Sequence, residues 1–127
     1  MIKACLFVAA GGALGALGRY FVTAGAAAWL GSGFPWGTLI VNVAGSFLLG
    51  VLVGLLSAAW TPTGDMRLFL ATGFLGAFTT FSAFSLDVVS AFERGLNWLA
   101  LLYVVASVVL SVLALLAGLR LMRLVLA

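Results

Sequence analysis

Four long apolar segments fill almost the whole chain. They are separated only by short polar interruptions, and four stretches contain no charged residue at all: 4–18, 20–64, 68–86 and 95–119. A membrane crossing by an α-helix takes about 20 predominantly apolar residues. The pattern therefore predicts an all-α integral membrane protein, a single domain over residues 1–127, with four transmembrane helices at approximately 3–30, 36–59, 66–92 and 96–124.

The interruptions contain the residues that end and start helices. Gly31 to Gly37 supplies glycine and proline for a turn, and Glu93-Arg94-Gly95 combines border charges with a glycine stop. Thr63 or Asp65 is suited to cap the third helix, because both side chains accept hydrogen bonds from backbone amides. We interpret the first apolar segment as a retained helix, since it continues to about Trp29 without a cleavage signal.

Polar side chains recur every four residues on two of the segments. The second segment has Thr38, Asn42 and Ser46, and the fourth has Tyr103, Ser107 and Ser111. Residues four apart lie on one helix face, so each stripe is expected to face away from lipid. Serine and threonine often only pack there. Asn42 differs because an unpaired amide in hydrocarbon costs several kcal/mol, so it needs a partner or a ligand.

The third segment contains the most unusual run, Gly73 to Ser85. It has two glycines, four hydroxyl side chains and four phenylalanines. The glycines weaken a helix and the Thr79-Thr80 pair can bond back to carbonyls of the preceding turn, which predicts a break near the middle of this helix. Non-helical backbone at membrane depth persists only where protein buries it or where it lines a watery path.

Composition excludes several functional classes. Only 7% of residues are charged, there is no histidine and there is one cysteine. A transition-metal site and an enzyme active site are therefore not expected, and the scattered net charge of +3 does not form a nucleic-acid-binding face.

The basic residues lie mainly at the segment borders. With four spans, one side of the membrane receives Lys3, Arg67, Arg120 and Arg123. The other receives Arg94, and also Arg19 if its side chain extends toward that border. A division of four basic residues against two is a weak positive-inside bias, which is compatible with insertion in both orientations.

The phenylalanines of the third segment point to anion chemistry. Phe81 and Phe84 are three residues apart and share a helix face. Aromatic ring edges are electropositive, so edges turned into a pore attract a small anion that has lost water. Convergence with Asn42 and the two polar stripes would give a narrow lining rich in neutral donors, which holds a hard monovalent anion without trapping it.

At these residues the sequence closely resembles the bacterial Fluc (CrcB) fluoride channels. The resemblance covers essentially the full length and rests on the run Gly73 to Ser85, with Gly37-Thr38, Asn42, Gly15 to Arg19, Tyr103 and Ser107. It implies an antiparallel, dual-topology homodimer in the bacterial inner membrane. Each dimer would hold two pores, lined by both subunits, that conduct fluoride passively and protect against its toxicity.

The resemblance also implies roles for individual residues. Arg19 would lie near an aqueous entrance, and the carbonyls of Gly76 and Thr79 from both subunits would hold a structural sodium ion at the dimer interface. The fluoride pore would be lined by Phe81, Phe84, Asn42, Thr38, Ser82, Tyr103, Ser107 and Ser111.

Two other functions remain open from the residues alone. A small four-helix proton-coupled drug or cation exchanger needs an ionisable group near the membrane midplane, and the candidates are Asp87 and Arg19. Asp87 lies close to the border charges, which disfavours that role. A non-transporting membrane scaffold would use the small-residue faces, such as Gly11 and Gly15, only for helix packing.

Overall fold

The computed structural model describes residues 1–127, and every regular element in it is a helix. The bounds of the predicted spans lie within two residues of those observed. The elements are α1 (Ile2–Leu30), α2 (Trp36–Ala58), α3 (Gly64–Arg67), the π-helical η1 (Leu68–Leu75), α4 (Gly76–Phe78), α5 (Phe81–Glu93) and α6 (Asn97–Val125). The third predicted span, Gly64–Glu93, thus consists of four consecutive elements.

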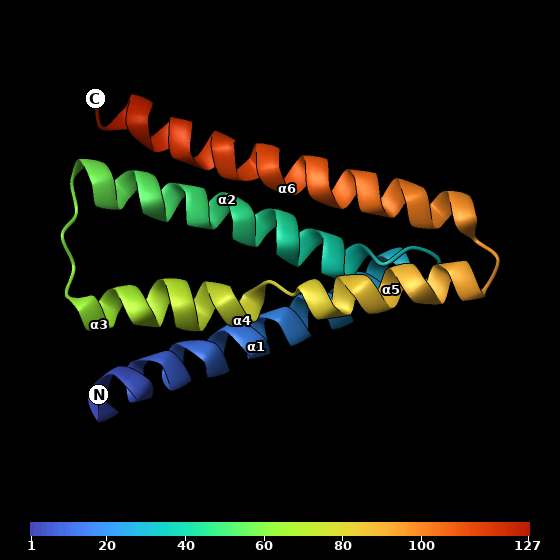
Figure 1. The fold of residues 1–127 in the computed structure, drawn as a ribbon, viewed down its shortest axis with the longest axis horizontal. Coiled ribbons are helices and arrows are strands. Elements are labelled where there is room, and N and C mark those ends of the chain that lie inside the picture. Colours follow the sequence, from blue (N-terminus) through green and yellow to red (C-terminus); the bar gives the residue numbers. More distant parts are fainter.

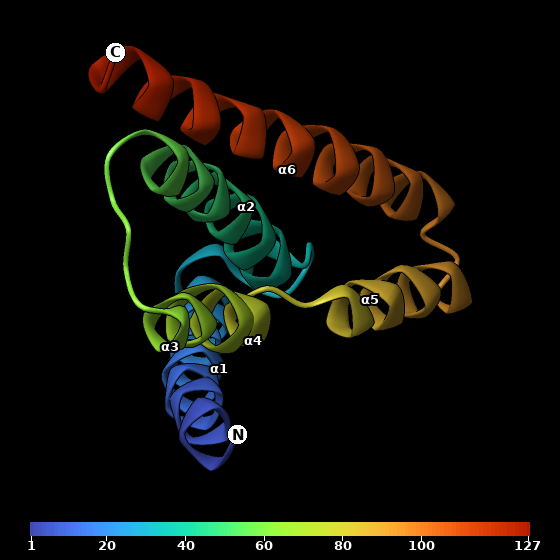
Figure 2. The ribbon, with the colours of Figure 1, turned by 60° about the vertical axis from the view of Figure 1, so that its left-hand side comes forward.

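The four spans run up and down along one long axis, so both termini lie at the same end (Figure 1). α2 and α6 lie side by side, and α1 lies against the first half of the third span. Seen from the side, α5 points away from α3 and α4, and the third span changes direction between α4 and α5 (Figure 2).

Glycines allow the close helix contacts. A Cβ at Gly11 would overlap the Phe69 carbonyl oxygen, and one at Gly15 would overlap that of Phe74, so α1 and the third span touch backbone to backbone. Gly50 makes the same kind of contact with Leu115 between α2 and α6. In lipid, where burial of apolar surface between helices gains little, such close packing supplies the attraction.

The third span is interrupted at Thr79 and Thr80. Both have extended backbone, with φ/ψ of −85°/155° and −152°/115°, whereas the flanking residues are helical. This confirms the predicted break. Two predicted helix ends are also confirmed. Gly31 and Gly95 have φ of 79° and 76°, a left-handed backbone that glycine adopts without strain.

Thr63 provides the cap at the start of α3. Its hydroxyl accepts a hydrogen bond from the Met66 amide at 3.2 Å. Asp65, the other candidate, instead forms an ion pair with Lys3, with 3.4 Å between Nζ and Oδ2. This pair joins the start of α1 to the start of the third span.

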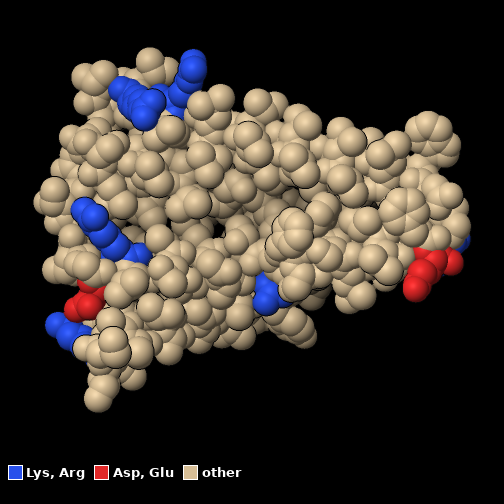
Figure 3. Space-filling model, viewed as in Figure 1, with Lys and Arg blue, Asp and Glu red and all other residues tan.

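The surface has the character of a membrane protein. Only 20 of 127 residues are buried, and large apolar side chains such as Trp29 and Trp98 are almost fully exposed. Four helical spans are long and apolar enough to cross a membrane. Most charged side chains gather at the two ends of the long axis (Figure 3). The protein is therefore a multi-pass membrane protein.

Candidate functional site

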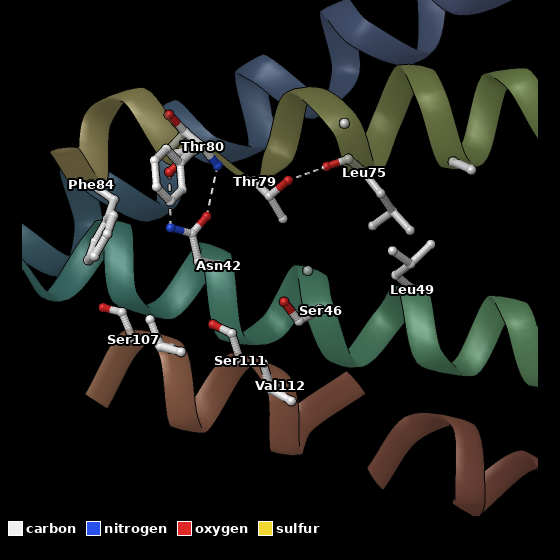
Figure 4. Close-up of a pocket in the computed structure, with 15 residues that line it drawn as sticks. Asn42, Ser46, Leu49, Leu75, Thr79, Thr80, Phe84, Ser107, Ser111 and Val112 are labelled. Carbon is white, nitrogen blue, oxygen red and sulfur yellow. Dashed lines mark hydrogen bonds between the residues drawn. The ribbon is translucent and has the colours of Figure 1, made fainter. Parts of the chain in front are cut away.

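Asn42 holds the interruption of the third span open. Its Nδ2 donates to the Thr80 carbonyl at 3.0 Å, and its Oδ1 accepts from the Thr80 amide at 2.7 Å. Figure 4 shows this side chain reaching from α2 to the backbone at Thr80. The polar partner that a membrane-buried amide requires is therefore the backbone of the break, and we call this pair of hydrogen bonds the Asn42 clamp.

The clamp diverts an amide from its helical partner. In a continuous α-helix the Thr80 amide would donate to the Gly76 carbonyl, four residues earlier. It donates to Asn42 instead, and the Ala83 amide donates to the Thr80 hydroxyl at 3.1 Å rather than to the Thr79 carbonyl. The carbonyl oxygens of Gly76 and Thr79 are thereby released from their regular donors.

The Thr79 hydroxyl bonds back into the preceding turn, donating to the Leu75 carbonyl at 2.9 Å. The sequence predicted this type of bond for the Thr-Thr pair. Thr80 caps α5 with its hydroxyl, so the two adjacent threonines stabilise opposite sides of the break.

Arg19 also contacts the break. Its Nε donates to the Ala77 carbonyl at 3.0 Å, in a partly buried position that joins α1 to α4. The Nε hydrogen bond therefore holds the Arg19 side chain against the interrupted third span. The carbonyl that lost its helical donor at the break attracts the guanidinium inward.

The predicted aromatic pair is close together but differs in exposure. The ring centroids of Phe81 and Phe84 are 5.5 Å apart, and Phe84 lies 5.1 Å from Tyr103. Phe84 is buried with 9% exposure, whereas Phe81 is 78% exposed in the single chain. Phe84 packs against Leu39 and Tyr103 in a small apolar cluster. One ring is therefore fixed, and the other faces outward.

The polar residues near these rings have different partners. Tyr103 is fully buried, and its hydroxyl donates to Asp87 Oδ2 at 3.0 Å. Thr38 is buried at 8% exposure. The Ser107 hydroxyl is buried and has no hydrogen-bond partner. An unpaired buried hydroxyl is costly, so Ser107 has a free donor that a ligand can use.

A cavity of about 440 Å³ joins the break to the fourth span. Figure 4 shows Asn42, Phe84, Ser107 and Ser111 lining it from three spans. The structure thus brings seven of the predicted site residues to one cavity: Asn42, Gly76, Thr79, Phe81, Phe84, Ser107 and Ser111. The other predicted residues, Thr38, Ser82, Tyr103 and Arg19, do not line it.

Sequence reasoning missed two contributors to this site. Thr80 lines the cavity, caps α5 and is held by Asn42. The hydroxyl three residues before the Ala83 amide was an available cap signal. Gly45 lets α2 approach the break, because a Cβ there would overlap the Thr79 methyl group. Only the tertiary contact reveals that role.

Known proteins resemble this chain over nearly its full length. Residues 6–119 match the family model described as CrcB-like protein, Camphor Resistance (CrcB). The chain belongs to the CrcB family. The span of the match includes every predicted site residue, so the whole cavity lies within the CrcB region.

Three bacterial proteins that are similar to this chain share the same name. A protein of Rhodospirillum centenum, named fluoride-specific ion channel FluC, is 53% identical over 122 residues, covering 96% of this chain and 97% of the relative. A protein of the same name from Nitrobacter winogradskyi is 50% identical over 120 residues, covering 94% and 95%. One from Agrobacterium fabrum is 53% identical over 116 residues, covering 91% and 93%.

Proposed function

We propose that this chain is a fluoride channel, which lets fluoride leave the bacterial cytoplasm passively across the inner membrane. The cavity beside the break carries the proposal. It combines the free hydroxyl of Ser107, the amide of Asn42 and the rings of Phe81 and Phe84, without a charged side chain in its lining. Relatives that are named fluoride-specific ion channel FluC support the same function.

The lining suits an anion that must lose its water. Fluoride forms strong hydrogen bonds, so hydroxyl and amide donors and ring edges replace its hydration. A lysine or arginine in the same place would bind the ion more tightly and release it more slowly. Beyond the cavity, Thr38, Ser82 and Tyr103 would extend the row of polar side chains that includes Ser111, and Arg19 would attract anions at an aqueous entrance.

An antiparallel second copy would complete two pores. In the single chain Phe81 is 78% exposed although it lines the cavity, and apolar residues such as Val108 and Val112 share that surface. Pairing of these surfaces would bury the ring and enclose the path. Each pore would then be lined by both subunits of the dual-topology homodimer.

The released carbonyls of Gly76 and Thr79 fit a structural sodium ion at the centre of such a dimer. Backbone oxygens are suitable ligands for a hard cation, and the hydrogen bonds of the break leave both groups without their regular helical donors. A bound sodium ion would supply positive charge that compensates the carbonyl dipoles. This ion would be held and not transported.

Fluoride efflux from liposomes tests the function. Purified protein is reconstituted with internal potassium fluoride, valinomycin carries the compensating potassium, and a fluoride-selective electrode records release. We expect rapid release of fluoride that needs no proton gradient, and negligible release of chloride, recorded with a chloride electrode, from matched liposomes loaded with potassium chloride. Proton-coupled uptake of an organic cation would favour the exchanger, and intact protein without any flux would favour the scaffold.

A further inference from the structure

A ring from the loop between α1 and α2 packs against the aromatic residues of the candidate site. Phe34 and Tyr103 have ring centroids 5.5 Å apart and ring planes at 83°, an edge-to-face arrangement. Tyr103 in turn lies 5.1 Å from Phe84, whose ring lies 5.5 Å from that of Phe81. A row of aromatic rings therefore leads from this loop to the cavity, and only its last two members line the cavity.

The backbone fixes Phe34 relative to the start of α2. Pro35 has φ/ψ of −78°/64°, and the Trp36 amide donates to the Phe34 carbonyl at 2.8 Å. These values are typical of an inverse γ-turn, and the proline ring sets φ in that range. The Trp36 ring also packs on Phe34, with 4.7 Å between the centroids. Phe34 is therefore held in one place although it lies outside a helix.

The neighbouring residues at this end of the bundle have no such contacts. A Cβ added at Gly31 or Gly33 would have no atom within 4 Å, and Ser32 is exposed. Trp29, at the end of α1, is 90% exposed. Phe34 is thus the residue through which the loop packs against the polar and aromatic residues of the site.

Tyr103 is enclosed between Phe34 and the site. Tyr103 is fully buried, and its hydroxyl donates to Asp87. Phe34 packs against the apolar cluster that contains Tyr103 and Phe84. Loss of the Phe34 ring would leave a void beside Tyr103, and side chains that line a void lose the packing contacts that fix them. Phe84 is the next ring in the row, so its position depends on this packing.

We propose that Phe34 is a positioning residue of the channel, which acts through Tyr103 to hold the Phe84 ring in the lining of the cavity. This inference rests on the fluoride function proposed above, in which Phe84 faces the path of the ion. Phe34 itself does not line the cavity, so its effect on fluoride is indirect. A loop at the end of the bundle thereby determines how firmly a ring of the path is held.

A double-mutant cycle between Phe34 and Phe84 tests this role. Phe34→Ala should lower fluoride efflux from liposomes at least about fivefold in the otherwise unmodified chain. In a Phe84→Ile background the same change should lower efflux less than about twofold, because the ring that Phe34 positions is already absent. Phe34→Leu keeps most of the apolar volume and should retain at least about half of the efflux.

Trp29→Ala is the matched control, because it removes an exposed aromatic side chain from the same end. Its efflux should stay within about twofold of each parent chain. Equal losses from Phe34→Ala in the two backgrounds, or no loss in either, would overturn the positioning role. If Phe34→Ala aggregates on size exclusion, Phe34→Val takes its place in the cycle, and the same comparison of backgrounds applies.

The same cycle on unfolding by SDS needs no fluoride. If Phe34 and Phe84 are coupled through Tyr103, the double variant should lose less of its folding equilibrium constant than the product of the two single losses, by at least about threefold. Independent losses would overturn the coupling. Failure of the fluoride function is distinguishable, because every chain would then lack efflux while the unfolding cycle still measured the coupling.

Discussion

Replacing Asn42 by alanine removes both hydrogen bonds of the clamp. If the break kept its shape, two backbone groups of Thr80 would lose their partner, each at about 1–3 kcal/mol, or about 2–6 kcal/mol together. The Thr80 amide has an alternative, because it can return to the Gly76 carbonyl and restore a helical bond. The loss of stability would then be about 1–3 kcal/mol, since only the Thr80 carbonyl stays without its partner.

The two outcomes for Asn42→Ala are separable by measurement. Unfolding by titration with SDS in mixed micelles, followed by circular dichroism, gives the free energy. Hydrogen exchange at the Thr80 amide shows whether it has a new acceptor. We expect a loss of about 1–3 kcal/mol, a protected amide, and fluoride efflux reduced at least about tenfold, because the donor and the shape of the break both disappear.

Asn97→Ala is the matched control. Asn97 is exposed at the start of α6 and its side chain caps nothing, so this variant should stay within about 0.5 kcal/mol of the unmodified chain and retain its efflux. If Asn42→Ala matched that control in both stability and efflux, the reasoning about the clamp would be refuted.

Three further predictions concern the rings, the helix contacts and the partly buried Arg19. Phe81→Ile or Phe84→Ile should reduce fluoride efflux severalfold with no change in elution on size exclusion; unchanged efflux in both would remove the rings from the path. Gly15→Ala should lower the free energy of unfolding by about 1–3 kcal/mol, because its Cβ meets the third span. Gly25→Ala, with open space around it, should raise that free energy by about 0.5–1 kcal/mol. Arg19→Leu should cost about 1–3 kcal/mol by leaving the Ala77 carbonyl unpaired.

Specific results would contradict the predictions for the glycine and arginine variants. Equal stability of the two glycine variants would mean that α1 does not pack as closely on the third span as described. For Arg19, the comparison is Arg123→Leu at the end of α6, which should change the free energy of unfolding by less than about 0.5 kcal/mol. Equal effects of the two arginine variants would contradict a specific role for the Ala77 hydrogen bond.

The spans and the break could be predicted from the sequence because both depend on local properties. Apolar length determines where the chain can cross a membrane, and glycine and threonine spacing in the run from Gly73 to Ser85 marks where the helix weakens. The cap at Thr63 followed from the same kind of short-range rule. The π-helical turn in η1 has no comparable signal in its residues.

The partners of the polar residues could not be predicted, because they are distant in sequence. Asn42 and Thr80 are separated by 38 positions, and Arg19 and Ala77 by 58. The sequence showed that a buried amide and a deep guanidinium each need compensation, but not which group provides it. Both find it in backbone groups that the break sets free.

The interruption in the third span is maintained by contacts within one polypeptide. The groups that bond to the interrupted backbone come from α1 and α2 of the same chain. Formation of the proposed dimer would then join two preformed halves, and little reorganisation of the backbone would accompany it. Assembly of that proposed dimer would depend mainly on two copies meeting in the bilayer.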